Sequence, residues 1–291
     1  MTHVVSSYLA TRLNILASKL IGLENWQSII DSDLEELLKR FSCFDENPSE
    51  LQSIEKQLIS LALQDFQLLF RPFFSVERDL LNYAVHWYEL TNLKTLIRGK
   101  FTGKNDVSIE KELLDLGQFA VLPLARLLQA DDPQEMLRLL ENTPYSSIVR
   151  QARSIYEEEG RNLFSLDAAI DRHFITGLLQ RIRFLEQNDL QEMTKVFGAV
   201  MDRLNLLWLI RYRFSYNLSP AKSFYLLATT GKKLHAENLM QLAKLDSISE
   251  VIEQLPAPMN ELLKQAQSMT EIENLMEHYT LMAAMKSLKH S

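Results

Sequence analysis

The fold is decided by a stretch that occurs twice, as ELTNLKTLIRGKF at residues 89–101 and as DRLNLLWLIRYRF at residues 202–214. Both copies follow the pattern acid-x-x-Asn-Leu-x-x-Leu-Ile-Arg-x-basic-Phe. Equivalent positions, such as Asn92 and Asn205, are 113 residues apart, and no gap interrupts the match. Repetition at a fixed period is typical of repeat architectures. The match therefore indicates that one unit of the chain was duplicated.

The apolar residues of each copy recur at three- and four-residue spacing, which predicts a long amphipathic helix. They are Leu93, Leu96, Ile97 and Phe101 in the first copy and Leu206, Leu209, Ile210 and Phe214 in the second. The acid and the asparagine, three positions apart, are neighbours on the surface of such a helix.

The polar residues of the motif are its candidate site residues. They are Glu89, Asn92, Arg98, Lys100, Asp202, Asn205, Arg211 and Arg213. We interpret them as structural groups that join each helix to its neighbours. A catalytic acid–amide pair is the alternative, but no nucleophile, metal-ligand cluster or phosphate-binding loop accompanies the pair in the sequence.

The composition predicts an all-α protein. The 291 residues are 46% hydrophobic, which is enough for a core and for two or three units of domain size. Glycine and proline are scarce, at eight residues each, and good helix formers are abundant. Alternating runs of valine, isoleucine and threonine, which predict strands, are missing.

The net charge of −7 argues against general nucleic-acid binding, which needs a basic face. A local basic patch is an alternative to an ordinary solvated surface; its residues would be Arg211, Arg213, Lys222, Lys232 and Lys233. The single cysteine, Cys43, excludes an internal disulfide and a thiolate zinc site. The sequence also predicts no signal peptide and no membrane span, since no stretch approaches ~18 apolar residues.

The sequence contains no pattern for catalysis, cofactor binding or metal binding. Asp131 and Asp132 resemble the magnesium-binding acidic motif of all-helical prenyl-chain enzymes, but Pro133 predicts that they begin a helix instead. The histidines show no metal-binding spacing, and neither a phosphate-binding glycine loop nor a Gly-x-Ser-x-Gly elbow occurs. We therefore expect no catalytic, cofactor or metal residues and no small-molecule substrate.

Each copy of the motif is followed by a turn and a short capped helix. The sequence predicts Ser108 and Ser219 as the caps, and Gly117 and Gly231 as the residues that end these helices.

The period predicts helical lobes at residues 1–115 and 116–230 and a partial third lobe at 231–291. A third copy of the motif, 113 residues beyond Asn205, would fall near residue 318, beyond the end of this chain. The last helix is predicted to begin at a capping box of Thr270 and Glu273. Its apolar stripe needs a surface to cover it.

Four stretches in order carry a family resemblance. They are YLATRL at residues 8–13, the first motif with its WY lead at 87–101, LENTPY at 140–145 and LDAAIDRHF at 166–174. In this order they resemble the C subunit of bacterial and archaeal V/A-type rotary ATPases, whose eukaryotic counterpart is the d subunit of V-ATPases. The resemblance covers nearly the whole chain.

The resemblance implies a funnel of three similar lobes around a pseudo-threefold axis, with the third lobe incomplete here. Such a protein has no active site. It sits on the membrane rotor ring, receives the foot of the central axle, and couples ATP hydrolysis or synthesis in the soluble head to proton or sodium transport. The implied partners are the central-axle subunits and the rotor ring, at a cytoplasmic location peripheral to the membrane. The ion and the direction of operation do not follow from the sequence.

Two other classes of protein stay open. An all-α protein-binding scaffold shares the fold arguments, but such scaffolds usually repeat every ~30–50 residues. An all-α enzyme would need a polar, water-excluding cavity with perturbed acids.

Overall fold

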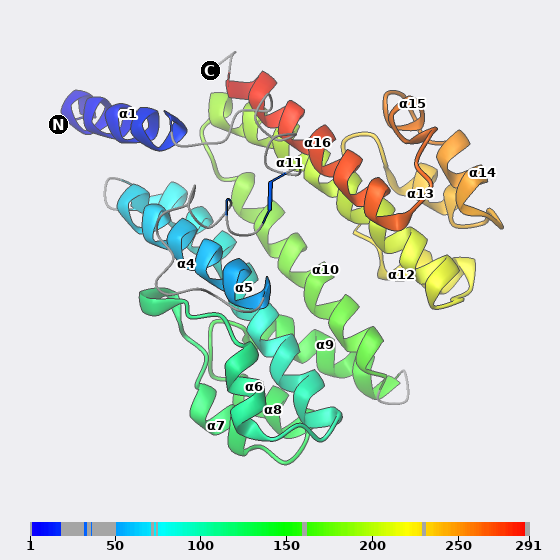
Figure 1. Cartoon of the computed structure of the whole chain (residues 1–291), viewed down its shortest axis with the longest axis horizontal. Coiled ribbons are helices and arrows are strands. Elements are labelled where there is room, and N and C mark those ends of the chain that lie inside the picture. The colour runs from blue at the N-terminus through cyan, green and yellow to red at the C-terminus, as the bar shows by residue number, and fades with distance from the viewer. Residues whose placement is uncertain are drawn as a thin grey trace. The chain divides into compact units, whose positions relative to one another are not determined.

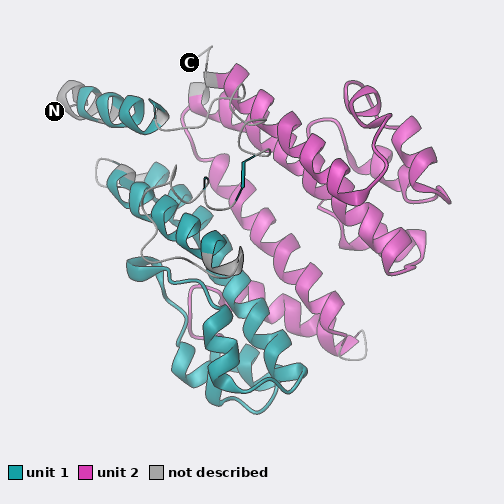
Figure 2. Ribbon diagram, in the orientation of Figure 1, with its two compact units in different colours: residues 1–139 teal, residues 140–291 magenta. Residues whose placement is uncertain are grey.

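The computed structural model describes residues 2–18, 32–33, 36, 51–70, 73, 75–158, 162–228 and 231–288. All regular elements in these ranges are helices, which confirms the all-α prediction. The chain divides into two compact units, residues 1–139 and 140–291 (Figure 2). These units are defined by contacts within the chain, whereas the three predicted lobes are defined by the repeat in the sequence. The lobe boundaries therefore stay a prediction. Cys43 lies outside the described residues.

The described residues of unit 1 form three long helices, α1, α4 and α5, followed by short ones (Figure 1). Its elements are α1 (Thr2–Ser18), α4 (Leu51–Phe70), α5 (Ser75–Phe101), α6 (Asp106–Glu112), the 3-10 turn η2 (Gly117–Phe119), α7 (Leu124–Gln129) and α8 (Pro133–Leu139). One core cluster joins α4, α5 and the segment around η2. Its buried members are Leu63, Phe70, Val85, Leu116 and Phe119. The predicted apolar stripe of α5 is buried at Leu93, Leu96 and Ile97, whereas Phe101 at its end is 60% exposed.

Unit 2 contains two pairs of long helices and a group of short ones (Figure 1). Its elements are α9 (Ser146–Glu158), α10 (Leu163–Ile182), α11 (Gln187–Ile210), the π-turn η3 (Arg211–Ser215), α12 (Pro220–Leu226), α13 (Ala236–Leu242), α14 (Ile248–Glu253), α15 (Met259–Leu263) and α16 (Met269–Leu288). α9 packs on α10, and α16 packs on α11.

The last helix, α16, packs on α11 within unit 2. α16 runs antiparallel to α11, because Ser287 near its end contacts Glu192, while Glu273 near its start contacts Arg211. Ile272 and Met276 of α16 are buried. α11 therefore covers part of the predicted apolar stripe: Ile272 is buried, Leu275, Tyr279 and Met282 are half-buried, and Met285 is exposed.

The helix caps match the sequence at some places and correct it at others. Ser219 caps α12 as predicted, its hydroxyl accepting from the N–H of Lys222. The prediction of Ser108 as a cap is wrong: Asn105 caps α6, and its Oδ1 accepts from the N–H of Ser108 at 2.8 Å. Three cap-forming residues lie in this stretch, Asn105, Asp106 and Ser108, and the helix begins after the first of them.

The two glycines do not end the short helices as predicted. α6 ends at Glu112 and α12 at Leu226, both several residues before Gly117 and Gly231. Gly117 instead begins η2 with a φ of +50°, which places it in the left-handed region that favours glycine. Gly231 instead lets the backbone pass close to the carboxylate of Asp202, as described below.

Two further helix starts were predicted. Asp132 does cap α8, accepting from the N–H of Glu135 at 2.8 Å, so this acid begins a helix. The capping box of α16 is shifted by two residues from the prediction. Ser268 accepts from the N–H of Glu271, and the Glu271 carboxylate accepts from the N–H of Gln267. α16 therefore begins at Met269.

The helices follow one another in a similar order in the two units. A helix of 20 residues occurs three times, as α4, α10 and α16. After α4 and after α10 comes the long helix that carries the motif, followed by short helices. The motif thus occupies the same place in both successions.

Candidate functional site

The asparagine of each motif copy binds both backbone groups of one residue further along the chain. Asn92 donates from Nδ2 to the carbonyl oxygen of Leu114 at 2.9 Å, and its Oδ1 accepts from the N–H of Leu114 at 2.8 Å. Asn205 makes the same two bonds to Ala228, at 2.6 and 3.1 Å. Since both asparagines are buried, each supplies a partner that buried backbone groups otherwise lack.

The acid of each copy binds two consecutive backbone N–H groups. Glu89 Oε1 accepts from the N–H groups of residues 121–122. Asp202 Oδ1 accepts from those of residues 233–234, at 2.9 and 2.8 Å. Glu89 is 1% exposed and Asp202 is 0% exposed. A buried carboxylate needs such donors, because an unpaired buried charge is very costly.

We call Glu89 and Asn92 the first clamp, and Asp202 and Asn205 the second clamp. In each clamp, two side chains one turn apart on a long helix hold the segment that follows the next short helix. The two clamps thus make the same kinds of hydrogen bond, with a glutamate Oε1 in the first and an aspartate Oδ1 in the second. No nucleophile or metal is needed for this task.

The second clamp has one additional partner, on α16. The hydroxyl of Tyr279 donates to Asp202 Oδ2 at 3.2 Å. Burial raises the pKa of Asp202 above its ordinary value, although its hydrogen bonds to the backbone and to Tyr279 act in the opposite direction. Burial, with the charge of Asp202, also raises the pKa of Tyr279. Asp202 therefore joins α11, the segment after α12 and α16.

Gly231 lies where a side chain would displace the second clamp. A Cβ atom built on it would lie against the Asp202 carboxylate and 2.7 Å from the carbonyl oxygen of Leu234. Both neighbours are held in place, so the close approach of this backbone requires glycine.

The basic residues of the first copy lie at the end of α5. Lys100 forms an ion pair with Asp106 of α6, with 2.8 Å between Nζ and Oδ1. Arg98 is exposed on the last turn of α5. Lys100 thus links the motif helix to the short helix after it.

The basic residues of the second copy bind within unit 2. Arg211 forms an ion pair with Glu273 of α16. Arg213, whose side chain is 14% exposed, donates to three carbonyl oxygens at 2.6–3.1 Å. They belong to Leu218, Ala243 and Leu245. Both arginines therefore have partners within unit 2: Arg213 is largely buried, and Arg211 is neutralised by Glu273 although its side chain is exposed.

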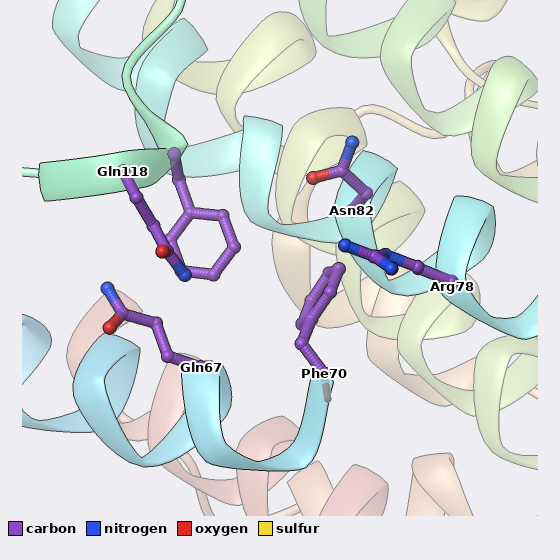
Figure 3. Close-up of a pocket in the computed structure, with 6 residues that line it drawn as sticks. Gln67, Phe70, Arg78, Asn82 and Gln118 are labelled. Atoms are coloured by element: carbon purple, nitrogen blue, oxygen red, sulfur yellow. The ribbon is translucent and has the colours of Figure 1, made fainter. Parts of the chain in front are cut away.

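A separate pocket of about 390 Å³ opens in unit 1 between α4, α5 and η2 (Figure 3). Its described lining consists of Gln67, Phe70, Arg78, Asn82, Gln118 and Phe119. No sequence signal points to this pocket, because its residues come from three separate stretches and form no motif. Across the described ranges, no group of three or more His, Cys, Asp or Glu residues could hold a metal ion.

Residues 9–291 match the model of the family described as ATP synthase (C/AC39) subunit. The chain belongs to this family. The C subunit of the A-type ATP synthase of Methanosarcina mazei is 22% identical over 255 residues, which are 84% of this chain and 69% of that protein. The corresponding protein of Methanocaldococcus jannaschii is 24% identical over 256 residues, 84% of this chain and 63% of that protein.

A shorter match has a higher identity. The C subunit of the A-type ATP synthase of Halorubrum lacusprofundi is 38% identical over 92 residues, 32% of this chain and 26% of that protein. The chain thus spans only part of the length of these relatives. None of the helices described here is both long enough and apolar enough to cross a membrane.

Proposed function

We propose that this protein is a non-catalytic central-stalk rotor subunit of a V/A-type rotary ATPase. It couples ATP hydrolysis or synthesis in the soluble head to proton or sodium transport through the membrane ring. Its partners are the central-axle subunits and the rotor ring, at the cytoplasmic side and peripheral to the membrane. The observation that carries the proposal is the family match over residues 9–291.

The geometry of the clamps supports a mechanical role. A protein that couples two partners must pass torque between them without deforming, and closely packed helices transmit strain well. Each clamp adds directional bonds between a long helix and a segment 22–33 residues further along the chain. The motif's buried acids and amides are thereby occupied with backbone groups and are not presented to a substrate.

We further propose that the lobes at residues 1–115, 116–230 and 231–291 are arranged around a pseudo-threefold axis. The threefold recurrence of the 20-residue helix supports this proposal, as do the matching bonds of the two clamps.

Partner recovery tests the proposed membership. The chain is tagged in its own cell, the membranes are solubilised in detergent, and captured proteins are identified by mass spectrometry. We expect recovery of head, axle and ring subunits. Capture of unrelated proteins without any part of the ATPase would instead favour the protein-binding scaffold.

Coupling requires a second measurement on the same membranes. Inverted vesicles from cells with and without the protein are compared for ATP hydrolysis and for ATP-driven ion uptake. Loss of uptake with hydrolysis retained by the head is the expected result. Unchanged uptake in vesicles without the protein would refute the coupling role.

A further inference from the structure

The pocket in unit 1 brings four polar side chains together around two phenylalanine rings (Figure 3). Arg78 and Asn82 lie one turn apart on α5, Gln67 lies on α4, and Gln118 lies in η2. In the part of the chain that the structure describes, none of these four makes a hydrogen bond or an ion pair with another side chain or with the backbone. Arg78, Asn82 and Gln118 are exposed and Gln67 is half-buried, so their hydrogen-bonding groups face solvent and are available to a ligand.

The unused groups belong to two chemical kinds. Arg78 offers a planar set of donors with one positive charge, which matches a carboxylate. The three carboxamides each offer a donor and an acceptor, which match the N–H and C=O of a peptide group. Figure 3 shows the amides of Gln67 and Gln118 on one side of the pocket, and Arg78 and Asn82 on the other.

The base of the pocket is apolar. Phe70 and Phe119 are 7% and 6% exposed, and their ring centroids lie 5.4 Å apart. They belong to the core of unit 1, so the surface they present is fixed. The volume of about 390 Å³ falls in the ~300–1,000 Å³ range of ligand sites.

We propose that this pocket binds the C-terminal end of a peptide chain. Arg78 pairs with the terminal carboxylate, the carboxamides bind the last peptide groups, and the phenylalanine rings contact an apolar side chain. This inference does not rest on the proposed role in a rotary ATPase.

The charge of the site selects a carboxylate over a phosphate. Arg78 is the one cation among the described lining residues, so it balances a single negative charge. Its neighbours in sequence, Glu77 and Asp79, are both acidic, so they weaken the attraction for a carboxylate and oppose a dianion about twice as strongly. Carboxamides on both sides also match an extended chain of peptide groups better than a compact anion.

Fluorescence anisotropy with the full chain tests the proposal. The probe is a fluorescein-labelled peptide pool, degenerate at its last positions, with either a free or an amidated C-terminus. We expect the free acid to bind, and both amidation and Arg78→Gln to weaken binding about tenfold or more, because a charge-assisted hydrogen bond is lost. Asn82→Leu should weaken binding as well.

The matched control is Arg126→Gln. Arg126 is exposed on α7 in the same unit but does not line the pocket, so its loss changes the net charge equally. Because both arginines are exposed, circular dichroism should show both variants folded. The proposal is overturned if the free-acid pool shows no saturable binding, or if binding is indifferent to amidation or to Arg78→Gln.

Discussion

Replacing Asp202 by alanine should destabilise unit 2 without altering its surface. The substitution removes the acceptor for the N–H groups of residues 233–234 and for the hydroxyl of Tyr279. A buried donor without an acceptor costs about 1–3 kcal/mol. Leu234 is fully buried, so the cost of leaving its N–H unpaired lies in the upper part of this range. Lys233 is exposed, so the cost for its N–H lies in the lower part. Removing a buried charge offsets part of this cost, so we expect the free energy of unfolding to fall by about 2–3 kcal/mol.

Asparagine at the same position separates the hydrogen bonds from the charge. Asp202→Asn keeps one oxygen for the two N–H groups, and its amide can donate to the hydroxyl of Tyr279. Because burial already disfavours the charged form of Asp202, we expect a loss of less than about 1 kcal/mol, smaller than that of Asp202→Ala.

The pH dependence of this difference has a definite sign. Burial raises the pKa of Asp202 in the folded state. Protonated Asp202 therefore contributes stability that is fully present below the pKa of the unfolded chain, about 3.9. This contribution is lost as the pH rises through the higher pKa of Asp202 in the folded state. The advantage of wild type over Asp202→Asn should therefore be larger near about pH 4 than near about pH 7.5.

Urea unfolding followed by tryptophan fluorescence measures these changes. Trp208 on α11 is the single tryptophan of unit 2, so replacing Trp26 and Trp87 by phenylalanine makes the signal specific to that unit. Asp246→Ala is the control, because its side chain is 94% exposed and should contribute less than about 0.5 kcal/mol. If Asp202→Ala unfolds at the same urea concentration as wild type, the clamp does not stabilise the fold as argued.

Two other substitutions test the remaining polar residues of the motif. Asn92→Ala should destabilise unit 1 by about 2 kcal/mol and speed hydrogen exchange at the amide of Leu114, since both backbone groups of that residue lose their partner. The control is Asn82→Ala, at an exposed position on the same helix, which should change neither the stability nor the exchange rate. Arg213→Lys should cost about 2 kcal/mol in the fluorescence assay, because a single ammonium group cannot reach three carbonyl oxygens in the geometry of a guanidinium. Arg211→Lys, which alters a half-exposed ion pair, should cost less than about 1 kcal/mol, and an equal cost for both arginines would contradict this account.

The features that depend on side-chain pattern were predicted from the sequence. The apolar stripe of each motif copy has the spacing of a buried helix face, and Leu93, Leu96, Leu206 and Leu209 are all fully buried. The all-α class followed from the same periodicity and from composition. The repeat itself directed attention to the acid and the asparagine.

The partners of these residues could not be predicted. Glu89 and Asn92 bind backbone groups, which every residue possesses, so the identity of residues 114, 121 and 122 carries no signal of the contact. The pocket was missed for a related reason. Polar residues such as Gln67 and Gln118 are ordinary on a helix surface, and only the packing of Phe70 on Phe119 brings them to one place.

The end of the motif differs in length between the two copies. Three residues separate Phe101 from the cap Asn105, whereas four separate Phe214 from the cap Ser219. Between the motif and the cap, the second copy is therefore one residue longer than the first.

The π-turn η3 accommodates this difference. At its end, the N–H of Tyr216 donates to the carbonyl oxygen of Arg211, five residues back, so the helix takes up one extra residue in a wider turn. The chain still leaves the helix through a left-handed residue in both copies, Gly103 and Asn217. The extra residue thus lies downstream of the clamp residues and does not shift them relative to their own helix. The junction between motif and cap is therefore a place where the chain tolerates a change of length, and a one-residue insertion there should leave the bonds of Asp202 and Asn205 intact.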